Sequence, residues 1–161
     1  MNKLKNSLLN SFSYALSGIF NCICNERNFR IHIVVSAYVL FFSRYFNLDR
    51  TDFVILCISI MFVLVCEMLN TSIESVVNYL SPDYNIHAKI AKDVAAGAVL
   101  LSAVFSIIIG LILFLKIDII KSVIVHIITN PLYLLVLAAS LIISWLFIFA
   151  FKFDKLTKGS K

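Results

Sequence analysis

Long apolar stretches separated by short polar segments dominate the chain. Four are candidates for membrane spans: residues 31–48, 53–66, 94–115 and 132–151. A hydrocarbon core about 30 Å thick is crossed by about 20 residues of α-helix, so the last two are long enough on their own. The first is short, but Arg44 near its end can extend its charge to the interface. The second reaches Glu67 after 14 uncharged residues and keeps helical character to Leu80. The pattern predicts four spanning helices.

The first 24 residues follow a different pattern. Apolar residues recur every three or four positions, at Leu8, Phe12, Leu16, Ile19 and Ile23. This spacing predicts an amphipathic helix that lies on the membrane surface. A secretory signal peptide is not expected, because polar residues such as Asn10 and Ser13 interrupt any apolar core.

Turn-forming residues mark the boundaries between these segments. Asp49 to Asp52 forms a tight polar turn with helix-capping side chains. The run SPDYN at 81–85 has turn chemistry, and Pro82 is expected to end the second span. Residues 116–131 form a partly amphipathic connection that closes at Asn130-Pro131.

Composition supports a membrane protein. Of the 161 residues, 61% are hydrophobic and 14% are charged. Soluble domains average about 45–50% apolar and about 25% charged residues, so a soluble globule and a disordered chain are both excluded. The four glycines are too far apart to form either glycine-rich phosphate loop. The four cysteines form no C-x-x-C pair, and we interpret them as ordinary thiols.

The net charge of +5 predicts orientation rather than nucleic-acid binding. With the N-terminus inside, four of the 14 basic residues lie outside: Arg44, Arg50, Lys116 and Lys121. The other ten lie inside: Lys3, Lys5, Arg27, Arg30, Lys89, Lys92, Lys152, Lys155, Lys158 and Lys161. Because cytoplasmic segments carry the excess of Lys and Arg, both termini are expected in the cytoplasm.

The second span carries polar residues where a membrane disfavours them. At 100° per residue, Asn70, Glu74 and Asn78 lie at about 300°, −20° and +20° from Glu67, on one helix face. Glu67 is about 21 Å along the axis from Phe53, still inside a core of about 30 Å. A carboxylate at that depth must be paired, protonated or metal-bound. Such a face can also be a simple helix–helix contact, but two carboxylates argue against that interpretation.

Two further clusters are expected at the same side of the membrane. Glu26 and Arg30 are one helical turn apart, and Lys92 and Asp93 head the third span. Alone they are typical of a surface ion pair and of interfacial anchors. The three histidines, His32, His87 and His126, lack metal-ligand spacing and are interpreted as interfacial side chains.

Together these groups fit phosphoryl transfer. That reaction needs a cation at the phosphates, a positive clamp and a base for the attacking hydroxyl. Glu26, Glu67, Glu74 and Asn70 could supply a cation site and a base, and Lys92 could neutralise a phosphate. At the membrane interface, the hydroxyl would belong to a lipid.

Three segments resemble one family of small bacterial membrane lipid kinases, the diacylglycerol and undecaprenol kinases. They are NERNFRIH at 25–32, EMLNTSIESVVN at 67–78 and AKIAKDVAAGAVLL at 88–101. The resemblance covers roughly residues 5–116. It implies a surface helix plus three transmembrane helices per chain, assembled as a homotrimer in the bacterial cytoplasmic membrane, with active sites shared between neighbouring chains.

The resemblance also implies roles for individual residues. Glu67 would be the catalytic base, supported by Asn70. Glu26 and Glu74 would hold Mg²⁺ together with ATP. The remaining positions would contact the nucleotide: Tyr14, Asp83, Tyr84, Asn85, Lys92 and Asp93.

The chain departs from the family pattern in two ways. Asn78 stands where members often have Asp, and Ser72 where Ala is common. Residues 117–161 add a connection, a fourth span and a basic tail that the family core lacks. We interpret this addition as serving packing or partner contact, because its acidic residues lie outside the apolar run.

The resulting prediction is an all-α integral membrane protein in three parts: surface helix (1–30), three-helix kinase core (31–116) and additional segment (117–161). The expected function is ATP- and Mg²⁺-dependent phosphorylation of a lipid alcohol. Undecaprenol is favoured over diacylglycerol because the form ERNFRIH resembles Gram-positive members.

Two alternatives are a four-helix transporter that uses an intramembrane Glu and a structural subunit without catalysis. In the transporter, the carboxylate would lie near the midplane, whereas these acidic residues crowd one end.

Overall fold

The computed structural model describes residues 2–81 and 83–150, with side chains from residue 8 onward. The helices are α1 (Asn2–Asn25), α2 (Arg27–Ser43), α3 (Arg50–Leu80), α4 (Ile86–Phe114), α5 (Ile117–Thr129) and α6 (Pro131–Trp145), followed by a π-helical segment, η1 (Leu146–Ala150). No strand occurs among the described residues. The expected all-α membrane fold is confirmed.

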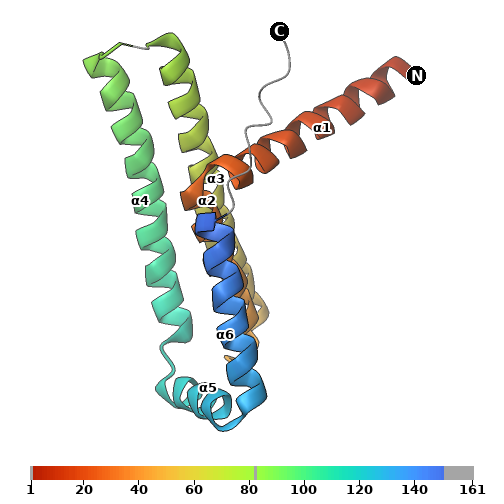
Figure 1. Cartoon of the computed structure of the whole chain (residues 1–161), viewed down its shortest axis with the longest axis vertical. Coiled ribbons are helices and arrows are strands. Elements are labelled where there is room, and N and C mark those ends of the chain that lie inside the picture. Colours follow the sequence, from red (N-terminus) through yellow and green to blue (C-terminus); the bar gives the residue numbers. More distant parts are fainter. Residues whose placement is uncertain (1, 82, 151–161) are drawn as a thin grey trace.

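Helices α2, α3, α4 and α6 run alongside one another, whereas α1 projects sideways from the bundle (Figure 1). Helix α5 crosses the end of the bundle opposite the α3–α4 turn and connects α4 to α6. Leu8, Phe12 and Leu16 on α1 are between 63% and 72% exposed. An apolar face without intrachain cover is typical of a helix that lies on a membrane, and that placement stays a prediction.

Within the described residues, three segments are long and apolar enough to cross a membrane: Arg50–Leu80, Ile86–Phe114 and Pro131–Ala150. They correspond to the second, third and fourth predicted spans. Residues 31–43 of the first predicted span belong to α2, a helix of 17 residues, whereas residues 44–48 lie beyond its end. Whether α2 crosses the bilayer stays a prediction, because about 20 residues are needed.

The turn residues Asp49 and Asn130 lie at helix starts, as the sequence predicts, whereas the predicted role of Pro82 lies outside the described residues. The Asp49 side chain caps α3 by accepting from the Asp52 N–H at 2.7 Å. Asn130 caps α6 by accepting from the Leu132 N–H at 3.1 Å, with Pro131 in the first turn. Proline is favoured at the position of Pro131 because the N–H groups of the first helical turn have no partner within the helix. Helix α3 ends at Leu80.

The buried core is small and lies between α3 and α4. Leu56, Ile60 and Leu113 form its centre. In the most apolar 18-residue window of each helix, 28% of residues are buried in α3, 11% in α4 and none in α6 with η1. Most apolar side chains thus point outward, as expected where lipid replaces water.

Candidate active site

Glu67 is the most enclosed of the predicted site residues. It lies on α3 and is only 4% exposed. Its Oε1 is 3.4 Å from Nε2 of His32, which comes from the first turns of α2. His32 is not among the site residues predicted from the sequence. The available signal was a titratable residue at the start of an apolar span, close to Glu26 and Arg30.

Asn70 and Glu74 follow on the same face of α3. The Asn70 carboxamide donates through Nδ2 to Oε1 of Glu74 at 3.0 Å. Its Oδ1 is buried and has no hydrogen-bond partner among the described residues. Because an unpaired buried acceptor is costly, this oxygen is suited to a cation or a donor that the chain itself does not supply.

Glu26 is the single residue between α1 and α2. Its extended backbone (φ −103°, ψ 109°) makes the bend between the two helices. Burial raises the pKa of the Glu26 carboxyl, the negative charge of Glu74 raises it further, and Arg30 opposes both. Glu67 interacts electrostatically with both of these carboxylates. The fold therefore gathers Glu26, Glu67 and Glu74, which are 48 residues apart at their extremes, into one acidic cluster.

The oxygen atoms of this cluster fit Mg²⁺. Magnesium is bound in kinases by one or two carboxylates, while waters and substrate phosphates complete its octahedron. Glu26 and Glu74 offer two carboxylates, and the unpaired Oδ1 of Asn70 offers a third hard oxygen. No group of three or more His, Cys, Asp or Glu side chains arranged for a metal occurs in the described part of the chain. A site that phosphate must complete agrees with that finding.

Lys92 joins the two long helices above the acidic cluster. Its Nζ donates to Oδ1 of Asn78 at 2.6 Å, which connects α4 to α3. Asn78 is neutral, so it holds the lysine without cancelling its charge. The neighbouring Asp93 is exposed.

The remaining predicted nucleotide contacts lie away from the carboxylates within one chain. Asp83, Tyr84 and Asn85 belong to the α3–α4 turn, and Tyr84 is 81% exposed. The Asn85 side chain caps α4, accepting from the N–H of His87 at 2.8 Å and of Ala88 at 3.4 Å. Tyr14 is exposed on α1, 11 residues before that helix ends, or about 16 Å along its axis. Their nucleotide roles stay predictions.

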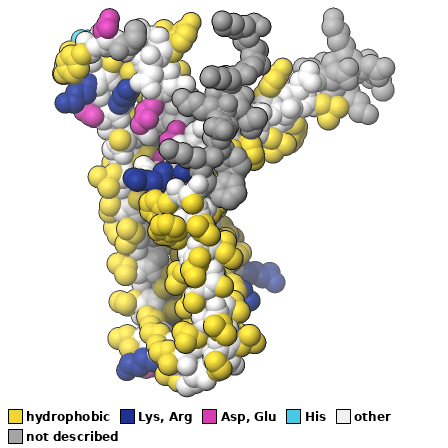
Figure 2. All heavy atoms as spheres, viewed as in Figure 1, with side chains coloured by type: hydrophobic (Ala, Val, Ile, Leu, Met, Phe, Trp, Pro, Cys, Tyr) yellow, Lys and Arg dark blue, Asp and Glu magenta, His cyan; other side chains and the backbone are white. Residues whose placement is uncertain are grey.

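Figure 2 shows how charge is distributed over this face. Most visible acidic side chains lie toward the α3–α4 turn, where basic side chains accompany them, and apolar side chains cover the middle of the bundle. A charged end next to an apolar middle suits a reaction between a water-soluble phosphate donor and a lipid.

Comparison with known proteins agrees with the motifs. The family model for prokaryotic diacylglycerol kinase matches residues 13–114. The chain belongs to this family. The predicted resemblance is confirmed, and the chain is a member of a lipid kinase family. The matched residues contain α2, α3, α4 and every predicted site residue.

Relatives in the prokaryotic diacylglycerol kinase family are named after one of two substrates, diacylglycerol or undecaprenol. A diacylglycerol kinase of Synechocystis is 40% identical over 105 residues, which are 65% of this chain and 60% of that protein. An undecaprenol kinase of Bacillus subtilis is 38% identical over 110 residues, covering 68% of this chain and 89% of that protein. A diacylglycerol kinase of Escherichia coli is 28% identical over 101 residues, which cover 63% of this chain and 83% of that protein. Helices α5 and α6 lie outside the family match.

Proposed function

We propose that this protein is an ATP-dependent kinase that phosphorylates the hydroxyl of a membrane lipid alcohol, with Glu67 as general base. The observation that carries this proposal is the buried Glu67 in one acidic cluster with Glu26 and Glu74, within a chain of the prokaryotic diacylglycerol kinase family.

The environment of Glu67 suits a general base. A base must accept the hydroxyl proton as the oxygen bonds to the transferred phosphorus. Nε2 of His32, on a different helix, lies 3.4 Å from the Glu67 carboxylate. Burial excludes water, which would otherwise compete with the lipid hydroxyl for the phosphoryl group.

Glu26 and Glu74 would hold Mg²⁺, with Asn70 completing the protein's oxygen donors. When bound, the cation neutralises charge on the phosphate oxygens. The hydrogen bond from Asn70 fixes one oxygen of Glu74 and leaves its own Oδ1 free for this purpose.

Lys92 would stabilise the negative charge of the ATP phosphates, and Asp93 and the 83–85 turn would contact the nucleotide. This arrangement would need a composite site in a homotrimer, because within one chain Tyr14 precedes the end of α1 by 11 residues, about 16 Å along the helix axis. The lipid, ATP and the bilayer are the proposed partners. The expected location is the bacterial cytoplasmic membrane, with both termini inside.

Undecaprenol is the first candidate substrate and diacylglycerol the second. The motif ERNFRIH favours undecaprenol. The names of the relatives support both, at 38% and 40% identity. A transporter is less well supported, because its carboxylate would face a midplane cavity.

A lipid phosphorylation assay tests the proposal. Purified protein in mixed micelles receives ATP, Mg²⁺ and either lipid. We expect one phosphorylated lipid, and a Glu67→Gln rate lower by about 10²–10⁴-fold, because the amide cannot accept the proton. Asp118→Asn, at the far end in α5, is the control and should keep full activity. Absence of product from both lipids with folded protein would refute the kinase proposal.

A further inference from the structure

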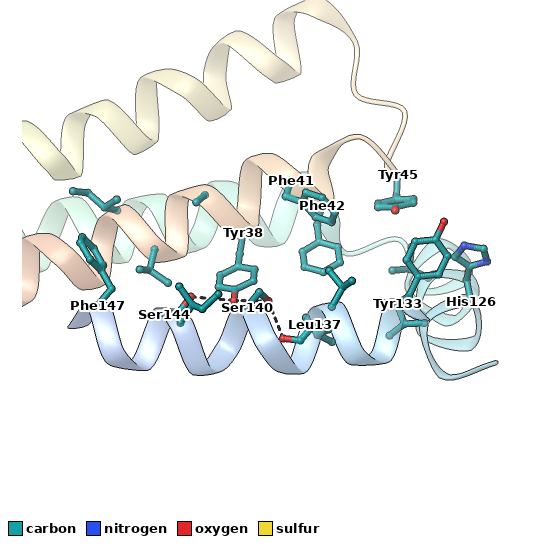
Figure 3. Close-up of a pocket in the computed structure, with 17 residues that line it drawn as sticks. Tyr38, Phe41, Phe42, Tyr45, His126, Tyr133, Leu137, Ser140, Ser144 and Phe147 are labelled. Atoms are coloured by element: carbon teal, nitrogen blue, oxygen red, sulfur yellow. Dashed lines mark hydrogen bonds between the residues drawn. The ribbon is translucent and has the colours of Figure 1, made fainter. Parts of the chain in front are cut away.

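The fourth span faces α2 of the kinase core across a cavity. A cavity of about 520 Å³ lies between α2 and α6, with α5 at one end (Figure 3). Its lining is almost wholly apolar and includes Phe41, Phe42 and Leu137. Close packing along the two helices is therefore limited, and specific contacts must hold α6 in place.

One polar contact lies at the cavity wall. The Tyr38 hydroxyl of α2 points at α6, where it lies 3.0 Å from Oγ of Ser140 and 3.1 Å from Oγ of Ser144 (Figure 3). In lipid, helices gain little from burying apolar surface, because the surrounding chains are equally apolar. Hydrogen bonds and direct packing then decide whether α6 stays on α2.

A further polar contact to the fourth span is made by Arg30, which is 7% exposed. Its Nη1 donates to the carbonyls of Ile23 at 3.0 Å and Cys24 at 2.9 Å. Its Nε and Nη2 donate to the carbonyl of Ile148 at 3.2 and 3.1 Å. One guanidinium thus joins the end of α1, the start of α2 and the π-helical end of the fourth span.

Two of the carbonyls that Arg30 uses are ones that a helix leaves without an intrahelical donor. Ile23 and Cys24 lie in the last turn of α1, where carbonyls lack such donors. Ile148 lies in η1, where the regular α-helical pattern is broken. Losing Arg30 would leave the two α1 carbonyls without this donor in an apolar setting, and losing η1 would leave the buried guanidinium with part of its donors unpaired.

This contact lies directly against the bend that carries Glu26. The Glu26 N–H donates to the Cys22 carbonyl at 2.9 Å, and the Arg30 N–H donates to the Glu26 carbonyl at 3.2 Å. The Glu26 backbone is therefore bonded to α1 through Cys22 and to α2 through Arg30. The Arg30 guanidinium bonds the two residues that follow Cys22, so it helps to fix the direction of α1 relative to α2 and with it the place of Glu26.

We propose that Arg30 is a positioning residue through which the fourth span, by its Ile148 carbonyl, fixes the α1–α2 bend and so places Glu26 for magnesium binding. The proposal rests on the proposed function, since it takes Glu26 as a magnesium ligand. It assigns a role to the segment that lies outside the family match.

Arg30→Gln tests the proposal in the full chain, with Arg30→Lys as a milder variant that keeps the charge. The matched control is Arg44→Gln, because Arg44 lies just after α2 at its other end and also donates to a backbone carbonyl, that of Phe41 at 2.8 Å. We expect Arg30→Gln to raise the Mg²⁺ concentration for half-maximal activity about 10–100-fold, as for lost supports of metal ligands, and to change kcat at saturating Mg²⁺ much less.

A second measurement reports on the fourth span without activity. Trp145 is the chain's only tryptophan and lies next to η1. Its fluorescence anisotropy should fall in Arg30→Gln, fall less in Arg30→Lys and stay unchanged in Arg44→Gln. An altered Mg²⁺ response with unchanged Trp145 anisotropy would overturn the role of the fourth span. Altered anisotropy with an unchanged Mg²⁺ response would overturn the link to Glu26.

The two proposals fail differently. If the wild type phosphorylates neither lipid, the proposed function fails. Stabilisation of the protein against heat by Mg²⁺ then replaces activity as the readout of metal binding. Loss of that stabilisation in Arg30→Gln, with lowered Trp145 anisotropy, would still support the positioning role, and its retention would refute it.

Discussion

The α3–α4 hairpin and the α5–α6 segment are both apolar, yet they are built differently. The hairpin contains the buried core and, along α3, the polar face that ends in the Lys92–Asn78 contact. No residue of α5, α6 or η1 is buried. Hydropathy alone does not distinguish the two regions. The difference lies in where polar side chains are placed: in the hairpin they belong to the proposed site, and in the added segment they attach α6 and η1 to α2.

Glu74→Ala should produce the largest change in metal dependence on the hairpin side. It removes one of the two proposed magnesium carboxylates and leaves the Asn70 amide without its acceptor. We expect the Mg²⁺ requirement to rise about 10–100-fold, which a magnesium titration of activity measures. Ser75→Ala, at an exposed neighbouring position, is the control. An unchanged Mg²⁺ requirement would remove Glu74 from the metal site.

Lys92→Gln tests the other end of the polar face. Hydrogen bonds to charged groups contribute about 1.5–3 kcal/mol, so the KM for ATP should rise at least about tenfold. Lys89→Gln, at an exposed position one turn earlier in α4, is the matched control. Equal effects of the two substitutions on ATP would mean that only the general positive charge matters.

The pH dependence of stability sharpens the view of Glu26. Its pKa is raised in the folded chain by burial and then by Glu74, so the folded state binds a proton more tightly than the unfolded state. This stabilisation is present below the ordinary pKa of a glutamate and is lost as the pH rises through the raised pKa. Without Mg²⁺, the temperature of thermal unfolding in detergent should therefore fall as the pH rises through that range.

Glu26→Gln supplies the comparison for this measurement. The amide does not titrate, so part of the pH dependence should disappear. Added Mg²⁺ should restore stability at neutral pH in the wild type, where the carboxylate is free to bind it. Identical pH profiles for the two proteins would contradict the raised pKa.

Tyr38→Phe should give the smallest effect and belongs to the added segment. It removes the hydroxyl that contacts Ser140 and Ser144. Hydrogen bonds between membrane helices average about 0.6 kcal/mol, so thermal stability should fall only slightly. Tyr45→Phe, in the same cavity wall, is the control (Figure 3). A large loss of lipid phosphorylation would show that this hydroxyl does more than attach α6 to α2.

Local sequence signals predicted much of the fold. Turn residues such as Asp49 and Asn130 cap helices where expected, because a cap needs only its own next few residues. Helical periodicity also predicted that Asn70 and Glu74 share a face, and their side chains are hydrogen-bonded. The connection at 116–131 contains a helix, α5, of 13 residues.

Contacts between helices could not be predicted in this way. His32 reaches Glu67 only because α2 and α3 pack at a particular height and rotation, which the periodicity of either helix does not specify. Arg30 meets Ile148 across 118 residues and binds a carbonyl, which leaves no mark in the side-chain pattern. The sequence predicted that Arg30 forms an exposed ion pair with Glu26, whereas the structure buries the Arg30 side chain.

The length of α3 has a physical consequence for the lipid. Its 31 residues span about 46 Å, more than a hydrocarbon core of about 30 Å. Glu67 is covalently fixed about 26 Å from the Arg50 end of this rod. In a thin bilayer Glu67 lies at the headgroups, and in a thick one it lies among the acyl chains. With Glu67 as the proposed base, the thickness of the membrane would set how deep a hydroxyl must lie to be phosphorylated, so lipid chain length would act on the reaction without any contact with the site.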